Sequence, residues 1–275
     1  MNLTLAEDFS DYPPRRAVAA HKGTFGHLAI VAGSVGYHGA AVLAARGAQR
    51  AQPGLVTLCV LENIYAPVAA QLQAVMVCPF VATPEIPDSC TAILCGPGLA
   101  SPDLPASLKS HIVDLWQTSP LPMVVDASAL DWLPAGATSS QALRVLTPHP
   151  GEAARLLKAT TAQVQADRPT ALRELSRRFG NCWVILKGHQ TLIGRSEGKM
   201  FINSSGNPYQ AQGGGGDVLA GFVGGLLAQP ELHRDVEKVL RYAVWQHGTA
   251  ADRLQESRSN WTVENLVMVL GSIGR

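Results

Sequence analysis

Short apolar runs alternate with helical patterns along most of the chain, and this alternation constrains the fold more than any other feature. The runs are apolar almost throughout rather than at every second residue, as in strands that helices cover on both faces. Strand, helix and strand in repetition predict an α/β fold with a doubly wound, mainly parallel central sheet flanked by helices. The runs are residues 28–33, 55–60, 74–78, 92–96, 123–127, 144–148 and 182–188, with helical patterns including 39–51, 151–159 and 169–180.

The pattern changes in the last third of the chain. A β-hairpin is expected first, and three helical stretches then follow one another without a strand, which predicts a helical C-terminal cap. Because no linker or change of composition interrupts the sequence, residues 1–275 are expected to form one domain. The hairpin arms are residues 191–194 and 198–206, and the helical stretches are 218–229, 235–256 and 262–273.

Composition and charge exclude several classes of protein. Hydrophobic residues make up 47% and charged residues 16%, which is enough apolar material for a core and too little charge for disorder. The 22 Lys and Arg residues nearly balance the 21 Asp and Glu residues, without long runs of either sign, so neither a nucleic-acid nor a membrane surface is expected. The first 16 residues carry acids and prolines where a signal peptide needs a cationic start and an apolar run, which predicts a cytoplasmic protein.

The five cysteines give no indication of a metal site or of disulfides. They contain no CxxC pair, and no histidine lies at ligand spacing, so buried free thiols in a reducing compartment are expected. We therefore assign no metal ligand from the sequence.

Glycine-rich, polar or proline-rich turns follow five of the predicted strands. Because ligands bind at the carboxyl ends of strands in open α/β sheets, these turns are expected to meet at one rim of the sheet. The turns are AGSVGYHGAA (32–41), CGPGLA (95–100), DASAL (126–130), TPHPGE (147–152) and KGHQT (187–191).

The run GGGGD, residues 213–217, is the strongest chemical motif. Four glycines bring bare N–H groups close to an anion, and the start of the following apolar helix adds partial positive charge, which predicts a phosphate site. Asp217 falls in the first helical turn, where the helix dipole is expected to keep it ionised and able to act as a general base. The alternative is a flexible loop in which Asp217 only caps the helix.

Two further motifs offer polar side chains at the predicted rim. His149 is held between two prolines in TPHPGE, either as a ligand contact or as an ordinary loop histidine. Lys187 begins KGHQT, where its ammonium could meet phosphate oxygens or simply be solvated at a strand end. The turn at 33–41 does not have the GxGxxG spacing of a dinucleotide site, and a Walker motif is absent from the sequence.

Six collinear motifs resemble the ADP- or ATP-dependent NAD(P)H-hydrate dehydratases, a family of the ribokinase-like superfamily. The similarity covers residues 15–255. It implies that ADP or ATP, usually with Mg²⁺, phosphorylates the hydroxyl of NAD(P)H hydrate, and that phosphate then leaves to restore NAD(P)H. The motifs are residues 21–34, 39–58, 95–100, 146–157, 186–193 and 206–229.

The resemblance also implies roles for individual residues. Asp217 would be the catalytic base and would contact the hydrate. Ala40 or Ala41, Gly98 and His149 would contact the hydrated dinucleotide. The adenine nucleotide would be bound by Lys187, Gly188, His189, Gln190, Thr191, Gly213, Gly214, Gly215 and Gly216.

The sequence departs from the family pattern at two places. Gly215 stands where the family usually has Ser or Thr, which removes a hydroxyl donor to phosphate, and Tyr209 and Gln210 stand where glycine and an apolar residue are expected. Two other functions therefore stay open: a ribokinase-like kinase of a vitamin-precursor alcohol, and a nucleotide-binding regulator without turnover. Only about 20 residues precede the first motif, so a separate chain is expected to supply the epimerase, and a homo-oligomer is expected.

Overall fold

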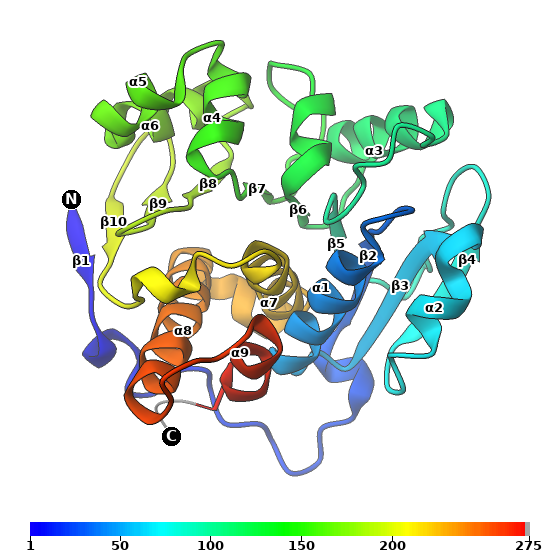
Figure 1. Cartoon of the computed structure of the whole chain (residues 1–275), viewed down its shortest axis with the longest axis horizontal. Helices are drawn as coiled ribbons and strands as arrows, with labels where there is room; N and C mark the ends of the chain where they lie inside the picture. Colours follow the sequence, from blue (N-terminus) through cyan, green and yellow to red (C-terminus); the bar gives the residue numbers. More distant parts are fainter. Residues whose placement is uncertain (273–275) are drawn as a thin grey trace.

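The computed structural model describes residues 1–272, which fold around one ten-stranded sheet (Figure 1). Neighbouring strands pair in the order β1-β10-β9-β8-β7-β6-β5-β2-β3-β4, and all pairings are parallel except the two made by β9. The strands are β1 (Asn2–Thr4), β2 (His27–Val31), β3 (Leu55–Leu61), β4 (Met76–Phe80), β5 (Ala92–Cys95), β6 (Met123–Val125), β7 (Arg144–Leu146), β8 (Trp183–Leu186), β9 (Leu192–Gly194) and β10 (Met200–Asn203).

Helices cover both faces of the sheet. In Figure 1, α3 to α6 lie above it, whereas α1, α7, α8 and α9 lie below it. This is the doubly wound, mainly parallel architecture that the alternation of strands and helices predicts, and its helical C-terminal part is also confirmed. The helices are α1 (His38–Arg50), α2 (Tyr65–Ala69), α3 (Ala106–Thr118), α4 (Pro150–Leu157), α5 (Thr161–Ala166), α6 (Arg168–Arg178), α7 (Gly215–Leu227), α8 (Val236–Ser257) and α9 (Val263–Val269).

Each predicted strand is present, and so is the hairpin, whose arms are β9 and β10. The sequence interpretation did not include β1, α2, α3 or α5. It also ended the third apolar run before Pro79, whereas β4 includes this proline; a proline is tolerated there because β4 is an edge strand. The last residue of the third predicted helical stretch, residue 273, lies outside the described residues.

The five cysteines are free thiols, in agreement with the sequence interpretation. Four of them are buried, but Cys78 is exposed on β4. The prediction of burial is therefore wrong for this residue, because an edge strand lacks the cover that the inner strands have. In residues 1–272, no helix is long and apolar enough to cross a membrane.

Helices α1 and α7 pack backbone against backbone. A methyl group on Gly221 of α7 would stand 1.9 Å from the carbonyl oxygen of Ala44, and one on Gly47 of α1 would stand 2.2 Å from that of Val218. Glycine is needed at these positions because any side chain would force the helices apart. The contact fixes the first turn of α7, which carries Asp217, against the helix that begins just after β2.

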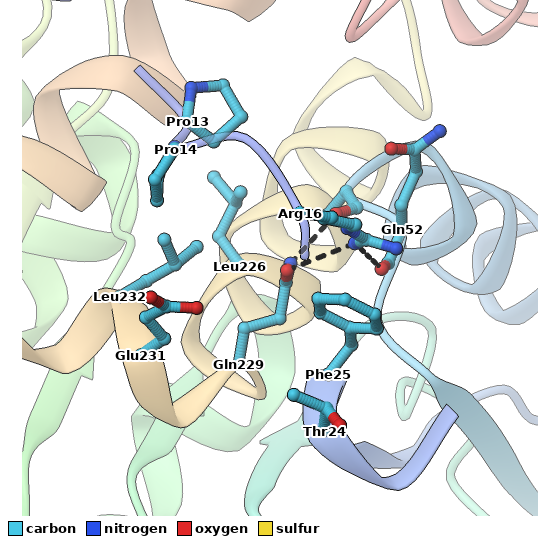
Figure 2. Close-up of a pocket in the computed structure, with 11 residues that line it drawn as sticks. Pro13, Pro14, Arg16, Thr24, Phe25, Gln52, Leu226, Gln229, Glu231 and Leu232 are labelled. Atoms are coloured by element: carbon cyan, nitrogen blue, oxygen red, sulfur yellow. Dashed lines mark hydrogen bonds between the residues drawn. The ribbon is translucent and has the colours of Figure 1, made fainter. Parts of the chain in front are cut away.

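The N-terminal segment is tied to the far end of α7 by Arg16. Its guanidinium stacks 3.7 Å from the ring centre of Phe25 and donates hydrogen bonds to the side chain of Gln229 (3.2 Å) and to the backbone oxygen of Gln52 (Figure 2). These contacts lie around a small hollow of about 30 Å³. We interpret it as a packing feature that anchors the chain before β2.

Candidate functional site

The five predicted turns lie at one rim of the sheet. They follow β8, β7, β6, β5 and β2, which are consecutive neighbours in the sheet and run in the same direction. The carboxyl ends of parallel strands point the same way, so one edge carries all five turns. The prediction of a common rim is confirmed.

Lys187 is a largely buried cation at this rim rather than a solvated one. Its side chain is 16% exposed, and its Nζ lies 2.7 Å from Oδ1 of Asp126 and 3.9 Å from Oε2 of Glu152. The hydroxyl of Thr147 donates a second hydrogen bond, of 2.6 Å, to the same Asp126 oxygen. Burial alone would lower the pKa of Lys187, but the neighbouring Asp126 and Glu152 outweigh it and raise the pKa, so the ammonium stays charged.

Asp217 stands in the first turn of α7 beside this cluster. Burial, together with the negative charge of Asp126, raises the pKa of Asp217 from 3.8 to about 7, although Lys187 opposes the shift. The sequence interpretation expected the helix dipole to keep Asp217 ionised. The structure differs because the carboxyl group is largely buried and because the carboxylates that follow β6 and β7 lie close to it. A base whose pKa lies near neutral pH is well suited to exchange a proton.

The glycine run forms the turn into α7. Gly214 is the N-cap residue with φ +93°, a left-handed conformation that glycine adopts without strain. In the described part of the chain, the N–H groups of Gly216 and Asp217 have no protein acceptor. A methyl group on Gly216 would lie 3.2 Å from Nζ of Lys187, so free N–H groups and the ammonium converge where an anion would be stabilised.

A cavity of about 600 Å³ opens beside this turn. Its walls come from the KGHQT turn after β8, the loop after β10, the start of α7 and the middle of α8. Seven of the nine residues predicted to bind the nucleotide line the cavity; Gly213 and Gly214 are the two that do not. The seven are Lys187, Gly188, His189, Gln190, Thr191, Gly215 and Gly216.

His247 of α8 holds the glycine turn from behind. Burial lowers the pKa of His247 to about 4, so the imidazole is neutral at physiological pH. Its Nε2 lies 3.0 Å from the carbonyl oxygen of Gly215, to which it donates, and its Nδ1 accepts from the side-chain amide of Gln210 at 3.1 Å. Gln210, one of the departures from the family pattern, is therefore part of a network that fixes the loop, whereas Tyr209 is exposed.

The residues that the resemblance assigns to the hydrated dinucleotide differ in how far they are exposed. Gly98, with φ +66°, is buried, and it packs against Ala40, which is partly exposed at the start of α1. Ala41 is fully buried and faces Gly33, so direct contact with a ligand is not available to it in this structure. We keep Ala40 as the accessible candidate and Gly98 as the residue whose left-handed backbone lies directly against it.

His149 is the N-cap residue of α4, and this gives it a structural task. Its Nδ1 accepts the N–H groups of Gly151 at 3.0 Å and of Glu152 at 3.4 Å, and the carboxylate of Glu152 accepts the N–H of His149 at 2.7 Å. This reciprocal pair is a capping box. The ring itself is half exposed and near the rim, so a ligand can still reach it.

Asp126, Glu152 and Asp217 form an acidic cluster around Lys187, and the sequence analysis identified only part of it. Asp126 and Glu152 lie in turns that the sequence analysis placed at the rim, but no role was inferred for them, and His247 was missed altogether. An acid directly after an apolar run, as in VVD, is the feature that indicates Asp126. His247 lies on a helix with no motif around it, and only its contact with the glycine turn reveals it.

The architecture of the sheet and its helices identifies the fold. It is a ribokinase-like fold: a protein from Enterococcus faecalis described as ribokinase-like superposes with a TM-score of 0.82, covering 98% of this chain and 94% of that one at 23% identity. The family model for NAD(P)H-hydrate dehydratase matches residues 28–269. The chain belongs to the NAD(P)H-hydrate dehydratase family.

Two relatives are similar over most of their length. An ADP-dependent (S)-NAD(P)H-hydrate dehydratase of Neisseria meningitidis is 39% identical over 249 residues, which cover 88% of this chain and 81% of the relative. The structure of an ADP/ATP-dependent NAD(P)H-hydrate dehydratase of Bacillus subtilis, co-crystallised with ATP/Mg²⁺, has a TM-score of 0.87 and 28% identity and covers 98% of this chain and 96% of that one. The chain spans about half the length of other curated relatives, which are named bifunctional NAD(P)H-hydrate repair enzymes.

Proposed function

We propose that this chain uses ADP or ATP to dehydrate (S)-NAD(P)H hydrate, releasing AMP or ADP, phosphate and NAD(P)H. Membership of the family and the names of the two relatives above support this reaction class. The observation that carries the proposal is the position of Asp217, whose carboxyl group has a pKa of about 7 beside free N–H groups and a buried ammonium. A hydroxyl group and a terminal phosphate brought together there would meet a base and an anion site at once.

The proposed chemistry has two steps. Asp217 accepts the proton of the ring hydroxyl while the hydroxyl oxygen attacks the terminal phosphorus, and the bond from that phosphorus to the leaving nucleotide breaks. The ring nitrogen then donates its electron pair as the carbon–oxygen bond to phosphate breaks, and a proton leaves the adjacent ring carbon. Water is thereby removed from the hydrate in the form of phosphate.

The chain's own groups stabilise the charge that moves during phosphoryl transfer. The N–H groups of Gly216 and Asp217 and the ammonium of Lys187 are fixed donors, which need no reorganisation when charge develops on the phosphoryl oxygens. The KGHQT turn and Gly215 supply the remaining cavity wall for the nucleotide. Gly213 and Gly214 contribute by shaping the turn.

The acidic cluster fits a magnesium ion that arrives with the nucleotide. One buried oxygen of Asp126, Oδ2, has no hydrogen-bond partner, and Glu152 lies nearby across Lys187. Residues 1–272 contain no group of three or more His, Cys, Asp or Glu side chains arranged to hold a metal, and Mg²⁺ commonly needs only one or two carboxylates besides phosphate and water. When bound, Mg²⁺ neutralises phosphate charge, and Asp126 and Glu152 are the residues that would hold it.

The proposal extends to the substrate and to other proteins. Ala40, Gly98 and His149 would contact the hydrated dinucleotide. An NAD(P)H-hydrate epimerase on another polypeptide would supply the (S) form of the hydrate, and the chain would assemble as a homo-oligomer.

The test measures recovery of reduced nicotinamide by absorbance. Purified protein is mixed with NADH hydrate, Mg²⁺ and ADP or ATP, and Asp217→Asn is measured beside the wild type, with Asp131→Asn as a matched control because Asp131 pairs with Arg155 at the surface. We expect the Asp217 variant to lose about 10²–10⁴-fold in kcat. We also expect kcat/KM of the wild type to fall as the pH drops below about 7, because Asp217 must be ionised to accept a proton.

Two results would contradict the proposal. Without recovery of NADH by the wild type, despite measurable nucleotide binding, the dehydratase reaction is excluded, and a stable phosphomonoester in place of free phosphate would identify a kinase. Full activity of the Asp217 variant would exclude this residue as the base.

A further inference from the structure

Arg168, the first residue of α6, gathers the carbonyl groups of the turn after β8. Its Nη2 donates to the backbone oxygens of Leu186 (2.9 Å) and Lys187 (3.2 Å). Its Nη1 donates to the oxygens of His189 and Gln190, the second at 3.4 Å. One half-buried guanidinium thus accounts for four carbonyl groups of consecutive or nearly consecutive residues.

These contacts dictate where the N–H groups of the turn point. In a trans peptide the C=O of one residue and the N–H of the next lie on opposite sides, so each carbonyl that faces Arg168 turns an N–H away from it. The N–H of Lys187 is used by the backbone oxygen of Pro148 at 2.9 Å. Those of Gly188 and Gln190 have no acceptor among residues 1–272.

The same turn lines the 600 Å³ cavity, and its middle residues are exposed. Gly188 has φ +130° and Gln190 has φ +53°, so the backbone adopts left-handed conformations at both. Successive N–H groups in such a turn form a concave site for anions. The guanidinium behind the turn offsets the outward carbonyl dipoles that would otherwise meet solvent.

We propose that Arg168 is a positioning residue for the nucleotide: it holds the carbonyl groups of the 186–190 turn away from the cavity, so that the freed N–H groups form a second anion site for the phosphates. This inference rests on the proposed use of ADP or ATP. Arg168 touches neither the substrate nor the reacting atoms, and it acts through the turn.

Burial and charge agree with this role. Burial lowers the pKa of Arg168, and the described part of the chain offers it no carboxylate within ion-pair distance. Within residues 1–272, the hydrogen-bond acceptors of the Arg168 guanidinium are therefore backbone carbonyl oxygens. A lysine in its place has three donors on a single nitrogen and no planar fork, so it cannot hold four carbonyl groups in the same geometry.

The same helix contains a matched control. Arg173, one and a half turns further along α6, donates to the backbone oxygens of Arg195 (3.0 Å), Ser196 (2.9 Å) and Gly198 (2.9 Å). That turn joins β9 to β10 and does not line the cavity. Both arginines order a turn by collecting carbonyl groups, but only Arg168 orders one that faces the nucleotide.

The experiment compares Arg168→Ala, Arg168→Lys and Arg173→Ala in the full chain. Calorimetric titration with ADP and with ATP gives Kd, the NADH-recovery assay gives KM and kcat, and thermal unfolding shows that each variant is folded. For both Arg168 variants we expect the nucleotide Kd and KM to rise on the order of tenfold, while kcat at saturating nucleotide changes much less. For Arg173→Ala we expect the nucleotide Kd to stay within about twofold of the wild type.

Chemical rescue adds a readout that a general loss of stability would not produce. Millimolar guanidinium should restore part of the nucleotide affinity of Arg168→Ala and leave that of Arg173→Ala unchanged. The inference is wrong if Arg168→Lys binds ADP and ATP as the wild type does, or if both alanine variants weaken binding equally. If the wild type itself binds neither nucleotide, the proposed function has failed, which is a separate result; if Arg168→Ala does not fold, Arg168→Lys decides.

Discussion

Replacing Asp217 by Asn should stabilise the protein at alkaline pH while it removes the proposed base. The folded protein raises the pKa of this carboxyl group from 3.8 to about 7. Between these values the folded state holds a proton that the unfolded state has lost, so the wild type loses stability as the pH rises through about 7. Asn carries no charge at any pH and escapes this loss.

The magnitude follows from the same pKa values. Each pKa unit corresponds to about 1.4 kcal/mol, so a rise from 3.8 to about 7 sets a ceiling of about 4 kcal/mol. Asp217 is partly accessible to solvent, which screens its repulsion from Asp126 and Glu152. We therefore expect the Asn variant to gain about 2 kcal/mol relative to the wild type between pH 4 and pH 8.

Urea unfolding of both proteins at pH 4, 6 and 8 measures this gain. Glu264→Gln is the matched control, because Glu264 also lies in the first turn of a helix but has its pKa lowered, chiefly by a hydrogen bond from Thr262. Its carboxylate contributes stability above the unfolded pKa that is lost as the pH falls, so its replacement should have the opposite pH dependence. A stability difference between Asp217→Asn and the wild type that is the same at all three pH values would refute the reasoning.

Two further substitutions test the packing and the charge cluster. Gly221→Ala would place a methyl group 1.9 Å from the backbone oxygen of Ala44 and should lower the free energy of unfolding by about 3 kcal/mol. In the control Gly39→Ala the added methyl group meets no atom within 4 Å, so the free energy of unfolding should not fall. Equal effects of the two substitutions in urea unfolding would contradict the close contact of α1 and α7. Lys187→Met leaves Asp126 buried without its cation and should cost about 3–5 kcal/mol at pH 8. A loss much smaller than this in urea unfolding would show that the ion pair contributes little to stability.

The fold was predictable because its inner strands leave a strong pattern in the sequence. A strand covered on both faces must be apolar throughout, so β2, β3 and β5 to β8 are visible as continuous runs. β1 is three residues long and exposed at two of them, and no local pattern distinguishes it from a loop. It forms because it pairs with the free edge of β10, and β10 lies about 200 residues away in the sequence.

The site was predictable only where its residues lie in motifs. Lys187 begins a turn that follows a strand, so the rule that strand ends meet at one rim placed it there, whereas Asp217 was identified from the glycine run before it. That these two residues lie side by side was not predicted and is found only in the structure. The pKa of Asp217 could not be predicted, since it depends on the burial of its carboxyl group and on Asp126 and Glu152, whose distances are set by the order of the strands. Arg168 and His247 act through backbone atoms of other segments, and such contacts have no fixed spacing in a sequence.

Strand β9 runs antiparallel to its neighbours β8 and β10, and this direction brings two walls of the cavity together. After β8 the chain reaches the rim at Lys187, descends through β9 and returns through β10 to the same rim at Asn203, so two walls of the cavity are separated by only a short hairpin. A parallel connection would have needed a helix between them. Two walls of one cavity therefore come from neighbouring stretches of the chain, and the spacing between these walls is set by the pairing of β8, β9 and β10 rather than by a crossover helix.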